Sequence, residues 1–305
     1  MKRHESQTAV NPSRSGFSLI ELLVVIVIIG ILMALILPAI GRVRIRAQVT
    51  QSASELTQLD TAISKFQSDF GVEPFSELVV TENPSVSAWD SSAGLKLTRT
   101  RLRRIWPQLD FTGKVDFNAD GAFTGDSGSD ATITFLGSES LIFFLGGVMN
   151  RDVNGNAVVD PGEVSTTPSW IGFSKNPVTP FISSGSNRIG PYFTFDPARM
   201  VDTDGDGMME YLDSLPGQTT PIYFVSANNG QGYSSVMSIY AQGDGRTPLN
   251  KDSHQLISPG LDASFGFDPV AGLRRPYSAE IDLKAGRSQE ADNIANFKPG
   301  GTLEN

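Results

Sequence analysis

The chain has 305 residues, of which 39% are hydrophobic and 19% charged, so it can form a sizeable core and wholesale disorder is not expected. Its formal net charge of −9 does not suit a protein that binds the phosphate backbone of nucleic acids, because such a protein needs a basic face. The lack of cysteine excludes disulfides, thiolate metal sites and cysteine nucleophiles, and the only histidines are His4 and His254.

An apolar run near the N-terminus predicts a helix that spans a membrane. Residues 17–37 carry a single charge, Glu21, and a span needs about 20 apolar residues. A cleaved secretory signal is the first alternative, but its apolar core has ~7–15 residues and ends at a small-residue cleavage site, whereas this run is longer and ends at Pro38. Charge counting does not orient the span, because three basic residues precede it and three follow it: Lys2, Arg3 and Arg14, then Arg42, Arg44 and Arg46.

Glu21 is unusual because it lies inside this apolar run. Insertion scales assign ~2.5–3.5 kcal/mol to a charged side chain at the centre of a span, so such a residue is a functional hypothesis and is expected to find a partner. The alternative is that Glu21, near the start of the run, lies at the membrane interface and reaches water.

Residues 15–26 (SGFSLIELLVVI) resemble the prepilin signature of type IV pilins and type II secretion pseudopilins. The resemblance implies that a prepilin peptidase cuts between Gly16 and Phe17 and methylates the new N-terminus. It also implies that Glu21 pairs with the Phe17 amine of a neighbouring subunit during filament assembly, so that each buried charge compensates the other. Pro38 stands where the family commonly has a proline that bends the helix.

The same resemblance implies where the chain resides and what it contacts. The leader lies in the cytoplasm, the helix crosses the inner membrane once, and the remainder lies in the periplasm until the subunit enters a filament. The expected partners are identical subunits, other pseudopilins, the prepilin peptidase and the inner-membrane assembly platform with its ATPase. Nucleic acid is not an expected partner.

An amphipathic helix is predicted to continue beyond the apolar run. Between residues 47 and 70 apolar side chains recur on one helical face, which we expect to pack on a globular sheet. Gly71 and then Pro74 supply a stop for the helix. The members of the stripe are Val49, Leu56, Leu59, Ile63, Phe66 and Phe70.

The resemblance implies an α+β fold in which a long N-terminal transmembrane and amphipathic helix packs on an antiparallel β-sheet head, the lollipop shape of pilins, with a large loop-rich insertion. Within the head, residues 139–149 predict a core helix, and the composition of 192–195, 222–227 and 235–240 predicts strands. The expected segments are the prepilin leader (1–16), the transmembrane and filament-core helix (17–40), the amphipathic continuation and turn (41–74) and the head (75–305).

A basic cluster precedes Trp106 in the sequence. It has two interpretations: a helix face that is simply solvated, or a docking patch for another subunit. Both stay open at the level of sequence. The cluster consists of Arg99, Arg101, Arg103 and Arg104.

An acidic loop matches the spacing of a calcium-binding loop. In residues 202–213 (DTDGDGMMEYLD), oxygen-bearing side chains recur at the ligand positions and a glycine stands where the loop turns sharply. Calcium takes about 6–8 oxygen ligands, which clustered carboxylates supply. A solvated acidic turn is the alternative. The predicted ligands are Asp202, Asp204, Asp206, the carbonyl of Met208, Glu210 and Asp213.

Two further loops match this pattern less closely. Residues 152–163 have oxygen-bearing side chains at the same positions, but Ala157 replaces the glycine of the turn. The loop that begins at Asp116 has Thr124 and Ser127 at its later positions, where Asp126 offers a substitute. The predicted ligands of the second loop are Asp152, Asn154, Asn156, Asp160 and Glu163.

A fourth calcium site is implied by resemblance alone. Residues 249–305 resemble the last part of the major pseudopilin head, a part in which the family holds calcium. Asp262 and Asp292 occupy the matching acidic positions. Asp268 and Glu290 are the nearby alternatives.

The leading hypothesis is a structural subunit, not an enzyme: a component of a periplasmic pseudopilus or type IV pilus-like filament, with type II protein secretion as the first expectation. A minor type IV pilin or adhesin is the related alternative. A membrane-anchored calcium-dependent hydrolase is the alternative from another class, although His254 has no recognisable nucleophile-elbow context. Glu21 discriminates between a filament subunit and a membrane-anchored hydrolase, because a helix that only anchors an enzyme has no need of a carboxylate in lipid.

Overall fold

A computed structural model describes residues 16, 18–83, 85–113, 115–117, 132–150, 168–183, 185–278, 280, 281, 283 and 286–304. The chain forms two compact units, Met1–Ala47 and Gln48–Asn305, and we call the second unit the head. Helix α1 (Leu19–Phe70) begins in the first unit and ends in the head.

The part of α1 in the first unit exposes its apolar side chains. Between Leu19 and Leu37, the large apolar side chains range from 45% exposed at Val25 to 85% exposed at Leu19. This stretch has the length and composition of a membrane-spanning helix, in agreement with the sequence prediction. Pro38 lies within α1, and the bend predicted there stays a prediction.

The part of α1 in the head buries one face, as the apolar stripe predicts. Val49 and Phe70 at its two ends pack against the core and are partly buried. Fully burying a leucine, isoleucine or phenylalanine side chain stabilises a fold by about 1.5–3 kcal/mol. The helix ends where Gly71 adopts a φ of 73°, which glycine tolerates without a steric penalty. The fully buried members of the stripe are Leu56, Leu59, Ile63 and Phe66, each at most 2% exposed.

The described part of the head contains short helices and strands after α1. The α-helices are α2 (Val86–Trp89), α3 (Ala93–Ile105) and α4 (Ser138–Gly146), and the 3-10 helices are η1 (Pro197–Arg199) and η2 (Ser288–Glu290). The strands up to the middle of the head are β1 (Glu77–Val80), β2 (Ile133–Leu136), β3 (Phe173–Ser174), β4 (Arg188–Ile189), β5 (Met200–Val201) and β6 (Glu210–Tyr211). The later strands are β7 (Tyr223–Ser226), β8 (Ile239–Ala241), β9 (His254–Ser258), β10 (Arg274–Pro276), β11 (Ile294–Ala295) and β12 (Lys298–Thr302).

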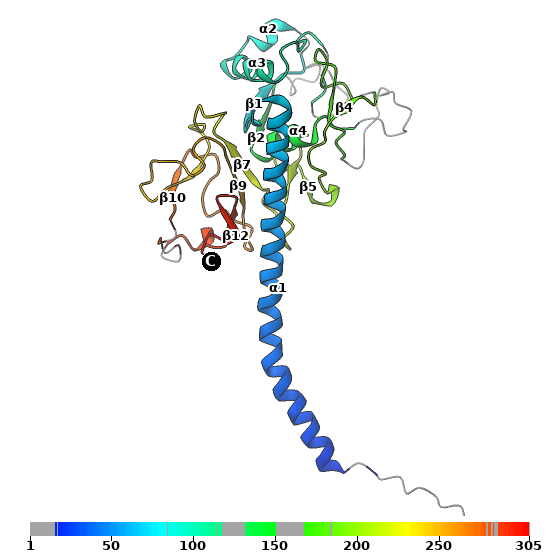
Figure 1. Ribbon diagram of the computed structural model, residues 1–305, viewed down its shortest axis with the longest axis vertical. Coiled ribbons are helices and arrows are strands. Elements are labelled where there is room, and N and C mark those ends of the chain that lie inside the picture. Colours follow the sequence, from blue (N-terminus) through cyan, green and yellow to red (C-terminus); the bar gives the residue numbers. More distant parts are fainter. Residues whose placement is uncertain are drawn as a thin grey trace, which may run out of the picture. The chain divides into compact units, whose positions relative to one another are not determined.

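The largest sheet of the described head is antiparallel and has four strands in the order β12-β11-β9-β7. The pairs β1–β2, β3–β4 and β5–β6 are also antiparallel, whereas β8 and β10 pair in parallel. The predicted α+β fold with antiparallel sheets is therefore confirmed, with one parallel pair in addition. Figure 1 shows α2 and α3 at one end of the head and β12 toward the other end.

Helix α4 confirms the core helix predicted from its apolar composition, and all of its residues are buried. The ring of Phe144 packs edge-on against Phe66 of α1, with 5.3 Å between the ring centroids. Gly147 follows the helix with a φ of 87°, and a Cβ atom there would lie 2.3 Å from the backbone of Gly172. Only glycine fits this close approach of two backbone segments.

Two of the three predicted strands need correction. Residues 222–227 do contain β7, but residues 235–240 become a strand only at their end, in β8. Residues 192–195 form no strand, because the N–H groups of Tyr192 and Phe193 donate to the carbonyl of Leu145 at the end of α4. Aromatic composition suggested a strand there, whereas these aromatic side chains pack against α1 and β6.

Candidate functional site

Ser18 and Glu21 form a capping box at the first turn of α1. The Ser18 N–H and hydroxyl both donate to Glu21 Oε2 at 2.8 Å, and the Glu21 N–H donates to Ser18 Oγ at 3.3 Å. Such reciprocal bonds satisfy N–H groups that the first turn of a helix leaves without partners. Gly16, on the leader side of the predicted cleavage point, is exposed, and Phe17 lies outside the described residues.

The capping box gives Glu21 a second role that the sequence analysis did not foresee. The signal was present as the spacing Ser-x-x-Glu directly before an apolar run. Among the described residues, both hydrogen bonds that Ser18 donates reach Oε2, so the box holds the Glu21 carboxylate at the N-terminal end of α1. The predicted intermolecular pairing with the Phe17 amine stays a prediction.

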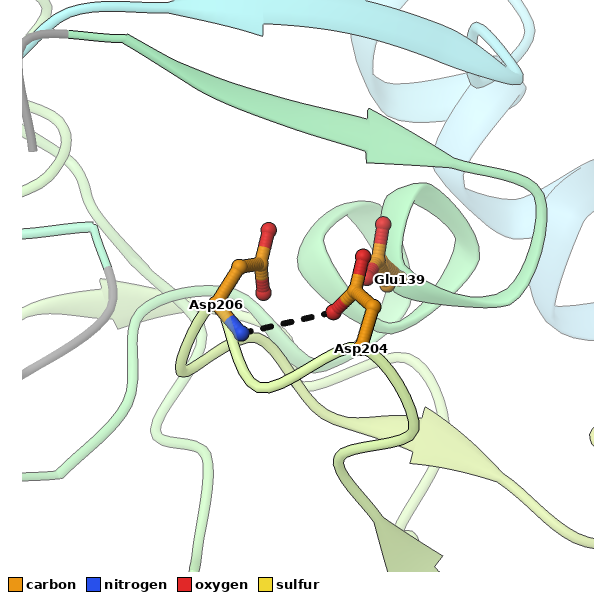
Figure 2. A group of neighbouring side chains, drawn as sticks. All are labelled: Glu139, Asp204 and Asp206. Atoms are coloured by element: carbon orange, nitrogen blue, oxygen red, sulfur yellow. Dashed lines mark hydrogen bonds between the residues drawn. The ribbon is translucent and has the colours of Figure 1, made fainter. Parts of the chain in front are cut away.

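Three carboxylates from two elements meet in the head. One carboxylate oxygen from each of Glu139, Asp204 and Asp206 lies within 4.8 Å of the other two. Figure 2 shows the three side chains gathered between α4 and the neighbouring loop. Glu139 stands in the first turn of α4 and is 4% exposed, whereas Asp204 belongs to the exposed loop between β5 and β6. We call these three residues the acidic cluster. Glu139 is not among the ligands predicted from the loop spacing, because it lies 65 positions before Asp204.

The acidic cluster concentrates negative charge that protein groups offset only in part. Burial raises the pKa of Glu139 to about 8, against the lowering effect of a hydrogen bond from the Leu136 N–H, and the Asp206 and Asp204 carboxylates contribute to the rise. Burial also raises the pKa of Asp206, again with a contribution from Asp204. An arrangement of this kind favours a bound proton or a bound cation.

The remaining predicted ligands of loop 202–213 have other contacts. Asp202 braces the loop, because its two oxygens accept from the N–H groups of Gly205 and Gly207 at 2.7 and 3.2 Å. Glu210 Oε2 accepts from the Thr203 N–H at 2.9 Å, and Met208 donates its N–H to Asp206 at 2.8 Å. These three residues therefore shape the loop around the cluster.

Asp213, the predicted last ligand, lies apart from the acidic cluster. It is 2% exposed and accepts hydrogen bonds from the hydroxyls of Ser52 on α1 and Ser258 on β9. It also accepts from the Leu215 N–H at 3.2 Å. Asp213 therefore joins α1 to β9 of the four-stranded sheet. The third carboxylate of the acidic cluster comes from Glu139 instead.

The other two loops cannot be placed in the same way. Loop 152–163, with its five predicted ligands, lies outside the described residues, as does the part of the third loop from residue 118 to residue 131. Their calcium ligands stay predictions.

The C-terminal acidic residues Asp262 and Asp292 lie close together, and their calcium ligation stays a prediction. Asp292 Oδ2 accepts from the N–H groups of Leu261 and Asp262 at 2.6 and 3.0 Å, while its Oδ1 is buried and has no hydrogen-bond partner among the described residues. Burial, with a contribution from the Asp262 carboxylate, raises the pKa of Asp292. Glu290 is not a comparable ligand, because Arg275 and Arg287 hold its carboxylate.

His254 is the residue on which a hydrolase hypothesis would depend. Its imidazole is buried and hydrogen-bonded within the head. Its Nε2 lies 2.9 Å from Asp60 of α1, and its Nδ1 lies 3.0 Å from Ser253 and 3.4 Å from Glu73. It is 4% exposed at the start of β9. These contacts connect the C-terminal part of α1 to β9 of the four-stranded sheet.

Known proteins share the features of the N-terminal segment. The family described as "Prokaryotic N-terminal methylation motif" matches residues 11–37. A fimbrial protein of Pseudomonas aeruginosa is 35% identical over 158 residues, which cover 52% of this chain and 91% of that protein. The type II secretion system core protein G of Pseudomonas aeruginosa is 33% identical over 90 residues, which cover 27% of this chain and 63% of that protein. No solved structure matches the chain.

An apolar N-terminal helix that begins at a methylation motif and enters an α+β head defines a class of membrane-anchored filament subunits. Together with the long match to a fimbrial protein, these features show that the chain belongs to the type IV pilin and pseudopilin family.

Proposed function

We propose that the chain is a structural subunit, not an enzyme, of a pilus-like filament, and that a prepilin peptidase processes it between Gly16 and Phe17. The observation that carries the proposal is Glu21, a carboxylate in an apolar helix that hydrogen bonds from Ser18 hold at the first turn of that helix. Cleavage converts the Phe17 amide nitrogen into an ammonium group. That ammonium, on a neighbouring subunit, offsets the cost of the Glu21 charge in an apolar filament core.

The exposed apolar half of α1 supplies the rest of the assembly mechanism. In the membrane its side chains face lipid, and in a filament they face the same helices of neighbouring subunits. The charge pair sets the register of each incoming helix, because a helix that stops short leaves both charges unpaired in an apolar environment. An inner-membrane assembly platform would extract the subunit while the head stays in the periplasm.

The N-terminus of the mature chain tests this proposal. Mass spectrometry of the protein from its native host should show a chain that begins at a methylated Phe17. Deletion of the prepilin peptidase in the same host should leave the chain starting at its original N-terminus. A host that retains the leader on every copy while filaments still contain the protein would overturn the proposal.

We assign the filament to type II protein secretion as the first candidate, supported by the match to core protein G. The resemblance of residues 249–305 to the major pseudopilin head, noted from the sequence, points the same way. A type IV pilus is the second candidate, favoured by the fimbrial protein of which the chain spans 91%. Deleting the gene separates the two: loss of a secreted protein with intact surface pili supports secretion, and loss of surface pili supports the pilus.

We further propose that calcium stabilises the head at two places. At the acidic cluster, Glu139, Asp204 and Asp206 offer carboxylate oxygens close enough to share one ion, which would offset their repulsion. At the C-terminal pair, Oδ1 of Asp292 is buried and has no hydrogen-bond partner in the described part of the head, so it fits a ligand for the calcium that the family holds there, with Asp262 beside it. Calcium suits both places because it takes oxygen ligands in flexible geometry.

A further inference from the structure

Helix α3 is strongly basic, whereas the head to which it belongs is acidic. Residues 48–305 contain 18 lysines and arginines against 31 aspartates and glutamates. Five of those 18 basic residues fall within the 13 residues of α3, which contains no acidic residue. The helix therefore forms a basic element on a head that is otherwise acidic.

The structure divides these five cations into two groups. Arg101 points inward, where its guanidinium donates to the Glu77 carbonyl and to Asn228. Arg99 donates to both carboxylate oxygens of Asp90 at 2.7 Å. Both arginines thus have their partners within the head.

The other three cations lie on the outward face of α3. Helical spacing places Lys96, Arg103 and Arg104 opposite the buried face formed by Leu95, Thr98, Leu102 and Ile105, and all three are exposed. Within the part of the chain that the structure describes, no carboxylate forms an ion pair with any of them. Leu97 joins this face with 48% of its surface exposed. We call Lys96, Leu97, Arg103 and Arg104 the basic face.

The basic face is partly ordered before any partner arrives. The guanidinium of Arg103 lies over the Phe111 ring at 5.3 Å, and that of Arg99 lies over the same ring at 5.4 Å. Trp89 in turn packs edge-on against Phe111, with ring centroids 5.0 Å apart. Holding an arginine in place lowers the entropy lost on binding, which distinguishes this face from a freely solvated run of charges.

We propose that the basic face of α3 docks on an acidic surface of the head of a second copy of this chain. The occupant is argued from charge: the remainder of every head carries a large excess of carboxylates, which complements the cations of the basic face. Two basic faces repel each other, so the contact joins α3 of one copy to a different surface of the next. Such a head-to-tail contact does not close into a dimer and can propagate along a filament. The proposal rests on the proposed function, because it adds a contact between heads to the pairing at Glu21.

The decisive experiment reverses the outward charges in the full-length chain. The double substitution Arg103→Glu and Arg104→Glu should lower the yield of filaments about tenfold or more, while Arg103→Lys with Arg104→Lys should keep most of it. A matched control, Lys175→Glu with Lys251→Glu, changes the net charge equally at two other exposed lysines and should assemble normally. An unchanged melting temperature of the head would show that the reversal variant still folds.

Zero-length carbodiimide cross-linking tests the same contact without any substitution. In wild-type filaments made from a mixture of light and heavy isotope-labelled subunits, Lys96 should be joined to an aspartate or glutamate of a different copy. A cross-link from Lys96 to another protein, or to no carboxylate at all, would overturn the choice of occupant. If the reversal variant assembles like the wild type while Glu21→Ala does not, the docking proposal fails and the proposed function stands. If the wild type forms no filament, the proposed function itself fails.

Discussion

The two halves of α1 follow opposite rules of burial. In the first unit its large apolar side chains are at least 45% exposed up to Leu37, whereas in the head those of the buried stripe are at most 2% exposed. The first half therefore depends on groups outside the chain, namely lipid or other subunits. The second half buries its apolar side chains against residues of the head. Substitutions in the first half should act on assembly alone, and those in the second half should act on folding.

The largest expected effect follows from Glu21→Ala. Under the proposed pairing, removing the carboxylate would leave the Phe17 ammonium of the neighbouring subunit without a counter-charge in an apolar core, so filament assembly should be lost altogether. The melting temperature of the head should stay unchanged, because Glu21 lies in the other unit. Electron microscopy of filaments and thermal unfolding of the head measure the two effects. A drop in melting temperature would contradict the view that the first half of α1 acts on assembly alone and the second half on folding.

Asp213→Ala should have the converse effect. It removes the acceptor for Ser52, Ser258 and Leu215 in a buried place, and we expect a loss of about 2–4 kcal/mol in the free energy of unfolding. Urea unfolding of the wild type and the variant measures the loss. Asp252→Ala is the matched control, because that carboxylate is 69% exposed beside Lys251 and should cost at most about 1 kcal/mol. Equal losses in the two variants would show that Asp213 does not join α1 to the sheet.

Calcium should give the next largest effect, again confined to the head. At a free concentration of about 100 times the dissociation constant, one bound ion contributes about 2.7 kcal/mol, which corresponds to a rise in melting temperature of roughly 5–10 °C. Glu139→Gln should remove the part of the rise due to the acidic cluster, and Asp292→Asn the part due to the C-terminal pair. Magnesium and Asp252→Asn are the controls. An identical melting temperature in calcium and in chelator would end the calcium proposal.

The pH dependence of the head should report on His254. Burial alone would lower the pKa of this imidazole, but Asp60 from α1 and Glu73 raise it above its ordinary value. The folded state thus binds the proton more tightly than the unfolded state. The resulting stabilisation is fully present below about pH 6.5, the ordinary pKa, and is lost as the pH rises through the raised pKa of the folded state.

Thermal unfolding between about pH 6 and pH 9 measures this loss, which should be the smallest of the four effects. Glu139, with a pKa raised to about 8, titrates in the same range. The comparison is therefore made in a Glu139→Gln background, where His254→Gln should flatten the dependence and His4→Gln should not change it. At the acid end, His254 and Asn296 lower the pKa of Asp60 despite its partial burial, so its contribution is lost only as the pH falls through that lowered value. A head whose stability is unaffected by pH across the neutral range would contradict the assignment of His254.

The features read correctly from the sequence are those that local pattern determines. The apolar run, the stripe between Leu56 and Phe66 and the glycine stop at Gly71 are properties of a single helix, so periodicity and composition suffice to predict them. The prepilin signature is equally local. Helix α4 belongs to the same group, because the apolar run from Leu141 to Leu145 is too short to span a membrane and is therefore expected in the core.

The sequence by itself determined that this chain has an apolar helix with one carboxylate near its start, and that its head carries acidic loops. Only the tertiary structure decided which carboxylates meet: it brought Glu139 to Asp204 and Asp206, and it drew Asp213 into hydrogen bonds with Ser52 and Ser258. It also turned residues 192–195 from an expected strand into a segment bonded to the end of α4. The physical reason is that hydrogen bonding and charge act through space, and the partners of a buried carboxylate are chosen by the packing of segments far apart in the chain.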